Sequence, residues 1–366
     1  MKIAVFHELP RGGARRAVNC FSFSFRKINQ VDLFITDERK ELSENKYYTK
    51  IYSYNFKPKH WGGKNWRIRL YKDTIELYKL NSLHRKIARD IDSKNYDIVF
   101  VSASKYVESP FILKYLKTPY IFYCSDPSYR IIYDKLFEVS RKPGFFRYWY
   151  EKANRFFRKI IDRQNIRASK YFLAPSKFIS GKFTEIYKKK CRVIYYGVDS
   201  IFFSPAKIKK DIDVFYIGSY DPMDGLDLLN EAIKHMKGKP KIRKLLAEDE
   251  WISDDRKLLE LYRRSKIMVC TARSEGLGAT ALEAMSCGVP VIAVDEAGHR
   301  ETVIDDKTGY LIPRDPKAMA EKIDWLLNNH EKLNELGKNA RKQMVKNWSW
   351  EKRANEMEQV FKSIIK

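Results

Sequence analysis

Residues 274–293 read SEGLGATALEAMSCGVPVIA, and this stretch carries the strongest structural signal in the chain. It follows an apolar run typical of a strand, opens with two glycines, continues at helical period and ends at a third glycine before a second apolar strand. Such a turn places backbone N–H groups at the amino end of a helix, where they bind phosphate or sugar oxygens. We therefore expect a ligand-binding loop from Gly276 through Leu277 and Gly278 to Ala279.

Two carboxylates bracket this loop. Glu275 and Glu283 are eight residues apart, about 12 Å if the whole segment were helical, which is similar to the distance from the sugar to the ribose of a nucleotide-diphosphate sugar. One acid can accept hydrogen bonds from the sugar hydroxyls while the other holds the ribose diol. The alternative is an ordinary strand-helix crossover with Glu283 in solvent, although the apolar helix face around this residue argues against it.

Outward from this segment, short apolar runs alternate with segments at helical period. Strands are expected at residues 2–6, 31–36, 96–103, 119–126, 171–175, 192–196, 213–218, 242–247, 266–271, 289–294 and 309–312. Helices are expected in the second half at residues 225–237, 255–265, 277–287 and 315–328. This alternation predicts two doubly wound α/β domains that meet near residues 197–206. Residues 40–95 are too polar and basic to assign.

The charge of the chain is uneven. Its 366 residues, 44% of them hydrophobic, carry a net charge of +25, which suits a folded protein and excludes a fibrous or disordered one. Residues 1–200 hold 42 basic and 19 acidic side chains, whereas residues 201–366 hold 29 and 27. The first half therefore calls for an anionic partner. Because the chain lacks the common nucleic-acid-binding motifs, we expect no nucleic acid.

The cysteines and the hydropathy pattern indicate the compartment. The five cysteines are odd in number and scattered, which excludes a disulfide framework and a paired-cysteine zinc site and predicts a cytoplasmic setting. No stretch approaches ~18 apolar residues, so we expect neither a signal peptide nor a transmembrane helix. Any membrane contact should be peripheral, on the inner face of the cell membrane.

Other segments agree with the one at 274–293. They are Gly12-Gly13-Ala14-Arg15-Arg16, Ala174-Pro175-Ser176, residues 193–205, 297–303 and 308–313, and Trp348-Ser349-Trp350. Together they resemble glycosyltransferase family 4, the retaining nucleotide-sugar transferases of GT-B fold, whose signature is a Glu-x7-Glu within E-G-F-G-x-x-x-L-E-A-M-A-x-G-x-P-V-I-A. The resemblance covers almost the entire chain.

The resemblance implies a GT-B fold, with two Rossmann-like parallel-sheet domains, a cleft between them and a C-terminal helix that crosses back. Residues 1–198 would form the acceptor-binding domain, 199–347 the nucleotide-sugar-binding domain, and 348–366 the returning helix. Glu275 would be catalytic and contact the donor sugar, Glu283 would hold the ribose, and the glycine loop between them would lie near the sugar and phosphates. No metal and no cofactor are implied, because in front-face chemistry the leaving phosphate takes the acceptor proton.

The match departs from the family where the donor diphosphate should be neutralised. The family carries Arg and Lys in F-V-G-R-x-x-x-x-K-G, and here these positions are Ser219 and Asp224. Losing two cations at the leaving group matters, since stabilising developing charge is a major catalytic contribution. The candidates for a substitute cation are Arg273, Arg300 or His299 near the cleft, or Arg15 and Arg16 across it.

The acceptor side is less well marked. Gly12 and Gly13 form the expected glycine loop after the first strand, and His7 ends that strand. Ser125 stands where many members carry His, and Asp126 beside it is a candidate acceptor-side carboxylate. Both His7 and Asp126 also have plain structural interpretations, as a strand-end side chain and as a turn residue.

Residues 141–170 contain ten basic and two acidic side chains, with aromatic and apolar residues recurring at three-to-four spacing. This pattern predicts a basic amphipathic helix that lies on an anionic bilayer. In the alternative, the aromatic stripe packs on the N-terminal sheet and the basic side chains are merely solvated. Both hold in part if different faces serve each role.

The leading hypothesis is a retaining, metal-independent glycosyltransferase of hexosyltransferase type. It would move a sugar from a nucleotide-sugar donor to a glycan or a phosphate-containing lipid-linked acceptor. The alternative is a degenerate GT-B sugar-nucleotide-binding protein without turnover, as Ser219 and Asp224 would allow.

Overall fold

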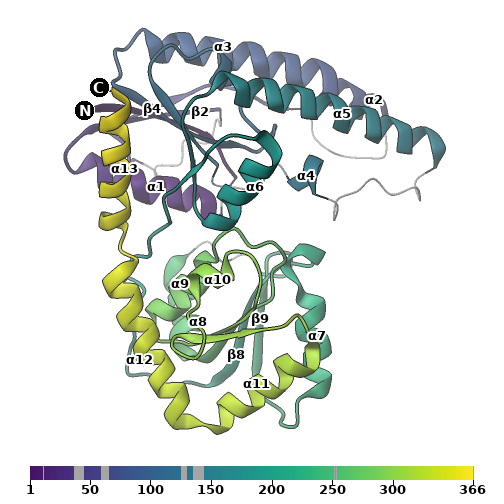
Figure 1. Cartoon of the computed structure of the whole chain (residues 1–366), viewed down its shortest axis with the longest axis vertical. Coiled ribbons are helices and arrows are strands. Elements are labelled where there is room, and N and C mark those ends of the chain that lie inside the picture. The colour runs from purple at the N-terminus through teal and green to yellow at the C-terminus, as the bar shows by residue number, and fades with distance from the viewer. Residues whose placement is uncertain are drawn as a thin grey trace. The chain divides into compact units, whose positions relative to one another are not determined.

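The computed structural model describes residues 1–10, 12–36, 45–58, 66–124, 130–134, 144–250, 252 and 254–365. Contacts divide the chain into two compact units (Figure 1). The N-terminal unit comprises Met1–Pro175, Ile179–Ile194 and Ala354–Lys366, and the C-terminal unit comprises Ser176–Phe178 and Tyr195–Arg353.

The N-terminal unit is built on a seven-stranded parallel sheet of order β3-β2-β1-β4-β5-β6-β7. In that order the strands are Lys50–Ser53, Gln30–Ile35, Lys2–Glu8, Ile98–Ser104, Tyr120–Tyr123, Phe172–Ala174 and Arg192–Val193. The central strands are buried apolar runs because helices cover both faces of a parallel sheet. The edge strand β3 falls in the segment left unassigned from sequence, because most of its side chains are exposed and lack an apolar pattern.

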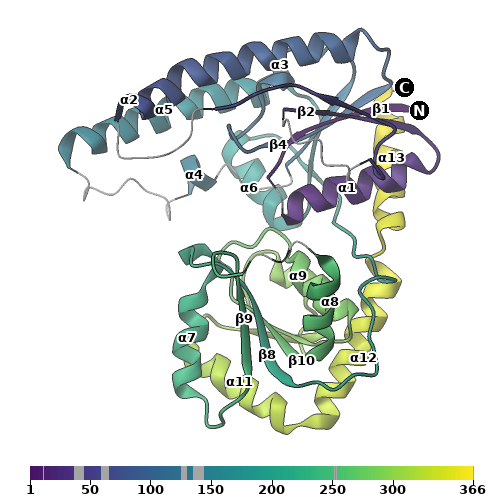
Figure 2. The same ribbon diagram turned by 180° about the vertical axis from the view of Figure 1, so that it is seen from behind.

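The helices of the N-terminal unit include one element from the far end of the sequence. They are α1 (Gly13–Arg26), α2 (Trp66–Tyr71), the π-helical η2 (Lys72–Glu76), α3 (Leu77–Asp92), the 3-10 segment η3 (Phe111–Lys114), α4 (Arg130–Tyr133), α5 (Phe145–Ala168), α6 (Lys177–Tyr187) and α13 (Trp350–Ile365). From α13, Phe361 packs at 5.3 Å from Phe25 and 6.1 Å from Phe100 between ring centroids. The predicted returning helix is thus confirmed, and Figure 2 shows it beside α1.

The C-terminal unit has a five-stranded parallel sheet of order β12-β11-β10-β8-β9. In that order the strands are Gly309–Ile312, Val291–Val294, Ser265–Cys270, Ile212–Gly218 and Ile242–Leu246. Its helices are the 3-10 segment η5 (Pro222–Asp224), α7 (Leu226–His235), α8 (Asp255–Arg264), α9 (Ala279–Ser286), α10 (His299–Thr302), α11 (Pro316–Asn328) and α12 (His330–Asn347). Two parallel-sheet Rossmann-like domains therefore confirm the predicted fold class.

Helix α5 is oriented against the usual amphipathic pattern. Asp162 and Asn165 are buried toward the unit, whereas Phe146, Phe156 and Phe157 are 87%, 61% and 61% exposed. The expectation that the aromatic stripe packs on the N-terminal sheet is therefore wrong. The first three residues of the 141–170 stretch lie outside the described part of the chain.

Candidate functional site

The loop before α9 differs from the expected open row of amides. Oε1 of Glu275 accepts hydrogen bonds from the backbone N–H groups of Leu277 at 3.3 Å and Gly278 at 3.0 Å. Two of the N–H groups that we expected to bind ligand oxygens are therefore paired within the loop in this structure. The Glu275 carboxylate instead lies at the amino end of α9, where the helix dipole favours a negative charge.

Gly278 sets the start of α9. Its backbone is left-handed, with φ of 89° and ψ of 58°, so the helix begins only at Ala279. The segment from Glu275 to Glu283 is therefore part loop and part helix, and the 12 Å spacing of a continuous helix does not apply to it.

A second loop, from β11 to α10, is docked on the first. The N–H of Gly298 donates to the Glu275 carbonyl oxygen at 2.9 Å. A Cβ on Gly298 would lie 2.7 Å from both the Gly276 carbonyl oxygen and the Leu277 Cα. Only glycine permits this backbone approach, so Gly298 fixes the relative position of the two loops.

Both loops contain non-glycine residues in strained backbone conformations. Ser274 has a φ of 53° and Ala297 a φ of 49°, in the left-handed region that costs L-residues free energy. Residues held in this way concentrate at ligand sites, where the surrounding structure imposes the conformation. The two strained residues flank Glu275 and Gly298, the two residues joined by the loop-to-loop hydrogen bond.

Glu283 is a buried side chain of α9 and not a solvated helix residue, with 5% of its surface exposed. Its Oε2 accepts a hydrogen bond from the Tyr262 hydroxyl at 2.9 Å. This bond orients the carboxylate. Tyr262 had no signal in the sequence, because it comes from α8 and only the fold brings it to Glu283.

Ser219 and Asp224, which replace the family's two cations, bond to each other. The Ser219 hydroxyl donates to Oδ2 of Asp224 at 2.5 Å. Burial raises the pKa of Asp224, and the neighbouring charges of Asp221 and Glu275 raise it further. The site at Ser219 and Asp224 therefore carries negative charge, and it would repel a diphosphate unless a cation lies close by.

Two of the expected substitute cations form ion pairs near the surface. Arg273 follows β10 and pairs with Asp227 at 3.2 Å, while its N–H donates to the Met223 carbonyl oxygen at 2.6 Å. Arg300 pairs with Asp295 at 2.7 Å and its side chain is 61% exposed. Arg273 is thus held beside the Ser219–Asp224 pair by its backbone. Of the three remaining candidates, Arg15 and Arg16 lie on α1 of the N-terminal unit.

His299 is buried where a positive charge on its ring is disfavoured. Only 2% of its surface is exposed, and its Nδ1 lies 3.4 Å from where a Cβ of Gly278 would be. Burial lowers its pKa, although the charge of Glu275 acts in the opposite direction. The neutral imidazole therefore packs beneath the glycine loop.

Arg314, which sequence reasoning missed, joins the two loops of the candidate site. Its guanidinium binds both carboxylate oxygens of Glu296 at 2.9 and 2.7 Å and donates to the Thr271 carbonyl oxygen at 2.9 Å. The hydrogen bond from Arg314 lowers the pKa of Glu296. The signal was its place directly after the segment 308–313 that was matched to the family.

The acceptor-side residues that the structure describes lie at the carboxyl end of β1. His7 is fully buried, and its Nδ1 accepts a hydrogen bond from the Leu9 N–H at 3.4 Å. Gly12 and Gly13 precede and begin α1, and a Cβ on either would meet open space. Ser125 and Asp126 lie outside the described residues.

A buried pair next to His7 was also missed. Oε1 of Glu8 lies 3.0 Å from Nε2 of His84 and accepts a hydrogen bond from the Thr36 hydroxyl at 2.8 Å. Burial raises the pKa of Glu8, but the charge and hydrogen bond of His84, together with hydrogen bonds from Ser104 and Thr36, hold it below its usual value. His84 comes from α3, in a segment that gave no sequence pattern.

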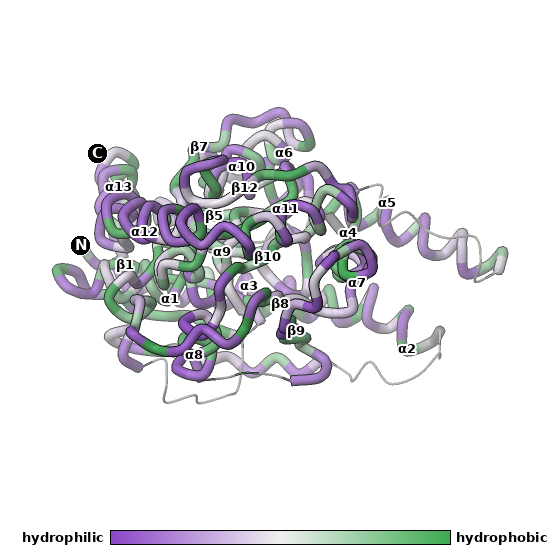
Figure 3. The backbone as a smooth tube through the Cα atoms, turned by 90° about the horizontal axis from the view of Figure 1, so that it is seen from below, coloured by the Kyte–Doolittle hydropathy of each residue, from purple (hydrophilic) through white to green (hydrophobic). Residues whose placement is uncertain are grey.

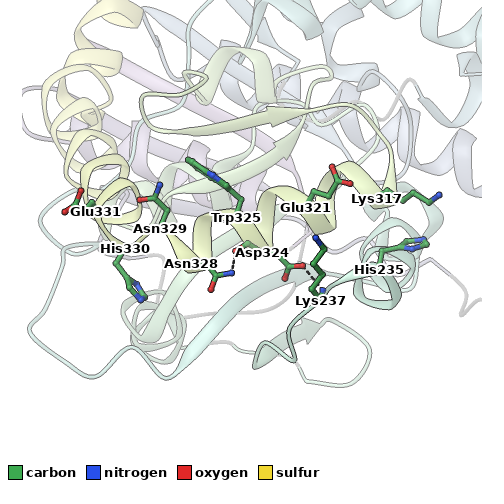
Figure 4. A pocket seen from close by; sticks show the side chains of 10 residues that line it. All are labelled: His235, Lys237, Lys317, Glu321, Asp324, Trp325, Asn328, Asn329, His330 and Glu331. Atoms are coloured by element: carbon green, nitrogen blue, oxygen red, sulfur yellow. Dashed lines mark hydrogen bonds between the residues drawn. The ribbon is translucent and has the colours of Figure 1, made fainter.

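A hollow of about 750 Å³ opens elsewhere on the C-terminal unit, between the end of α7, α11 and the start of α12 (Figure 4). Trp325 and Glu321 point to one side of α11, whereas Asp324 points toward Lys237 on the other. No residue of the predicted site lines this hollow. Helix α7 follows the carboxyl end of β8 and runs antiparallel to that strand. His235, at the end of α7, therefore lies near the amino ends of the strands, whereas the α9 loop lies at their carboxyl ends.

The described residues hold neither a cluster of metal ligands nor a membrane-spanning helix. Within those ranges, no three His, Cys, Asp or Glu side chains gather as ligands for a metal ion. None of the described helices combines the length and the apolar character needed to cross a bilayer.

Comparisons with known sequences match part of the C-terminal unit to a described family. Residues 250–343 match the family described as glycosyl transferases group 1. An uncharacterized glycosyltransferase of Methanocaldococcus jannaschii is 31% identical over 212 residues, or 52% of this chain and 59% of the relative. Spore coat protein SA of Bacillus subtilis is 30% identical over 154 residues, or 41% of this chain and 40% of the relative. The chain thus spans about half the length of these curated relatives.

Solved structures match over the full length. Sucrose-phosphate synthase of Thermosynechococcus elongatus aligns over 99% of this chain and 98% of its own with a TM-score of 0.72 and 16% identity. Anabaena HepE in complex with UDP-glucose aligns over 99% and 100% with a TM-score of 0.65 and 16% identity. The chain therefore has the GT-B fold of solved glycosyltransferases, and its residues 250–343 match the glycosyl transferases group 1 family.

Proposed function

We propose that this protein is a retaining glycosyltransferase that moves a sugar from a nucleotide-sugar donor to an anionic acceptor. The observation that carries the proposal is the group 1 match over residues 250–343, which contains Glu275 and its loop. A neighbour of the same fold was solved with UDP-glucose bound, which supports a nucleotide sugar as the donor class.

In this proposal the donor binds to the C-terminal unit. Glu275 contacts the transferred sugar, Glu283 holds the ribose, and the loop from Gly276 to Ala279 approaches the sugar and phosphates. The bond between the anomeric carbon and the phosphate oxygen breaks while a bond to the acceptor oxygen forms on the same face. The acceptor's hydroxyl proton passes to the leaving phosphate, so the step needs neither a metal nor a separate base.

Arg273 supplies the cation that Ser219 and Asp224 do not. Its ion pair with Asp227 involves side chains that are 33% and 65% exposed, and such pairs contribute only ~0–1 kcal/mol. A phosphate can therefore displace Asp227 at little cost. The Arg273 backbone, bonded to Met223, keeps the side chain close to the position of the family's missing Lys.

The acceptor is a glycan or a lipid-linked molecule that carries phosphate, bound to the N-terminal unit near His7 and the glycine loop at Gly12 and Gly13. The support is the charge of residues 1–200, with 42 basic and 19 acidic side chains. A lipid-linked acceptor would place the protein at the cytoplasmic face of the membrane, as a peripheral protein.

The test is a panel of UDP-, GDP- and ADP-sugars, with hydrolysis and transfer measured for the full chain with and without a metal chelator. We expect turnover of one donor that the chelator leaves unchanged. Turnover that a chelator abolishes would overturn the metal-independent step. Calorimetric binding of a nucleotide sugar without turnover, for every donor and acceptor, would instead identify a degenerate binding module.

The affinity for a nucleoside diphosphate should rise as pH falls, beyond what the phosphate's own titration produces. Because the pKa of Asp224 is raised, this carboxyl takes up a proton at a higher pH than an ordinary aspartate does. Its protonation removes a negative charge beside the diphosphate. In Asp224→Asn the affinity at a pH where the wild-type carboxyl is ionised should increase several-fold, and the extra rise in affinity as pH falls should disappear. Calorimetric titrations at several pH values measure both, with Glu321→Gln as a control at a distant carboxyl. An unchanged pH profile in Asp224→Asn would show that Asp224 does not face the phosphates.

A further inference from the structure

Helix α5 presents its apolar side to solvent and its polar side to the protein. The exposed residues include Phe145, Trp149 and Ile160, at 71%, 53% and 39%. At 100° per residue these three positions and Phe146, Phe156 and Phe157 fall within an arc of about 120°. A single continuous face of the helix is therefore aromatic and uncovered, and we call these six residues the aromatic face.

Polar side chains anchor the opposite side of α5. The carboxylate of Asp162 accepts hydrogen bonds from the hydroxyls of Ser109 at 2.6 Å, Tyr133 at 2.9 Å and Tyr187 at 2.8 Å. The side-chain amide of Asn165 donates to the Ser109 carbonyl oxygen at 2.8 Å. The unit thus binds the polar side of this helix, which leaves the aromatic face outward by construction.

Polar contacts between α5 and the rest of the unit continue toward the amino end of the helix. Glu151 pairs with Arg69 of α2 at 2.7 Å, and Asp73 of η2 accepts hydrogen bonds from the Tyr150 hydroxyl at 2.8 Å and the Asn154 amide at 3.1 Å. Figures 1 and 2 show α5 running beside α2 and α3 as an arm of the N-terminal unit. Polar contacts therefore join the helices of the arm along its length.

The acidic side chains of α5 face the protein, whereas basic side chains border the aromatic face. Both acids of the helix, Glu151 and Asp162, bond to the protein, while Lys152 and Arg163 border the aromatic face and are exposed. The ammonium of Lys152 lies 5.6 Å from the Trp149 ring centroid. Figure 3 shows α5 as alternating hydrophilic and hydrophobic positions. The outward surface is therefore aromatic and cationic, without an acidic side chain of α5.

We propose that the aromatic face of α5 binds the surface of an anionic lipid bilayer, with its aromatic rings among the acyl chains and its Lys and Arg side chains at the lipid phosphates. An anionic bilayer has an apolar interior beneath negatively charged headgroups, and it therefore matches a helix face that is both aromatic and cationic. A protein partner would need an acidic apolar groove that follows the helix for several turns. This proposal refines the membrane placement above but rests on no catalytic step.

The full chain, without donor or acceptor, is tested by co-sedimentation with two kinds of vesicle. One is pure phosphatidylcholine and the other contains about 30% phosphatidylglycerol, which supplies the negative surface potential. We expect binding only to the second kind, weakened when the salt rises from about 0.1 M to 1 M and the Debye length shortens. Equal binding to both vesicles, or to neither, would overturn the proposal.

Amino-acid substitutions test whether the aromatic face of α5 is the surface that binds the vesicles. The double variant Phe156→Ser and Phe157→Ser should lower vesicle binding at least tenfold, whereas Ile201→Ser, at a residue 90% exposed on the C-terminal unit, should not. Brominated lipids should quench Trp149 fluorescence, and the quenching should vanish in Trp149→Phe while binding persists. The proposal is overturned if the double variant keeps full vesicle binding. It is also overturned if sedimentation velocity shows that the wild type is a dimer and the double variant a monomer, because the aromatic face would then bind a second copy of the chain. Because no sugar transfer is measured, an inactive transferase would leave this result unaffected.

Discussion

Replacing Glu275 with Gln is expected to lower the rate of sugar transfer about a hundredfold to a thousandfold, the usual cost of removing one preorganised electrostatic group. The carboxylate is held by the N–H groups of Leu277 and Gly278, so it meets the reacting centre without having to reorganise. The amide of Gln keeps the shape but not the charge that stabilises the positive character developing at the sugar.

Initial rates over a range of donor concentrations separate binding from chemistry in this variant. We expect kcat to fall while the KM for the donor changes by less than about tenfold, since the lost interaction acts mainly in the transition state. Glu321→Gln, on α11 and outside the predicted site, serves as the matched control and should retain the wild-type rate. A Glu275→Gln enzyme with wild-type kcat would remove Glu275 from the mechanism.

Replacing Phe361 with Ala should destabilise the N-terminal unit by about 3–5 kcal/mol, as is usual for a buried phenylalanine. The ring is fully buried and packs against Phe25 of α1 and Phe100 of β4. Its removal leaves a cavity where α13 covers the sheet. For a unit of this size the midpoint of thermal unfolding should fall by roughly 6–20 °C.

Differential scanning calorimetry of the full chain measures this effect, and the transition of the C-terminal unit should stay in place. Phe156→Ala is the matched control, because this ring also lies on a helix but is 61% exposed. Its change should stay within about 0.5 kcal/mol. If both variants unfold alike, α13 does not complete the core of the N-terminal unit.

The fold was largely readable because parallel sheets covered on both faces leave continuous apolar runs in the sequence. The strand from Lys2 to Glu8 and the helix from Pro316 to Asn328 are examples, and both occur within a few residues of their predicted places. Strand β3 escaped because an exposed edge strand needs no apolar pattern.

The site was only partly readable, for a different reason. The glycines at 276 and 278 predicted a loop at a helix start, and the structure has one there. That Glu275 would bond to the amides of its own loop, and Glu283 to Tyr262, depends on geometry that no local pattern encodes. Periodicity likewise revealed the apolar stripe of α5, but not that Asp162 would turn it outward through hydroxyls distant in the sequence.

The place of α13 in the N-terminal unit also has a consequence for biosynthesis. Residues 354–365 belong to that unit, yet the ribosome translates them only after residues 195–353. At about 5–20 residues per second this delay lasts roughly 8–30 s, during which the nascent sheet displays Phe25 and Phe100 without their cover. The half of the protein that is translated first is therefore the second to complete its core.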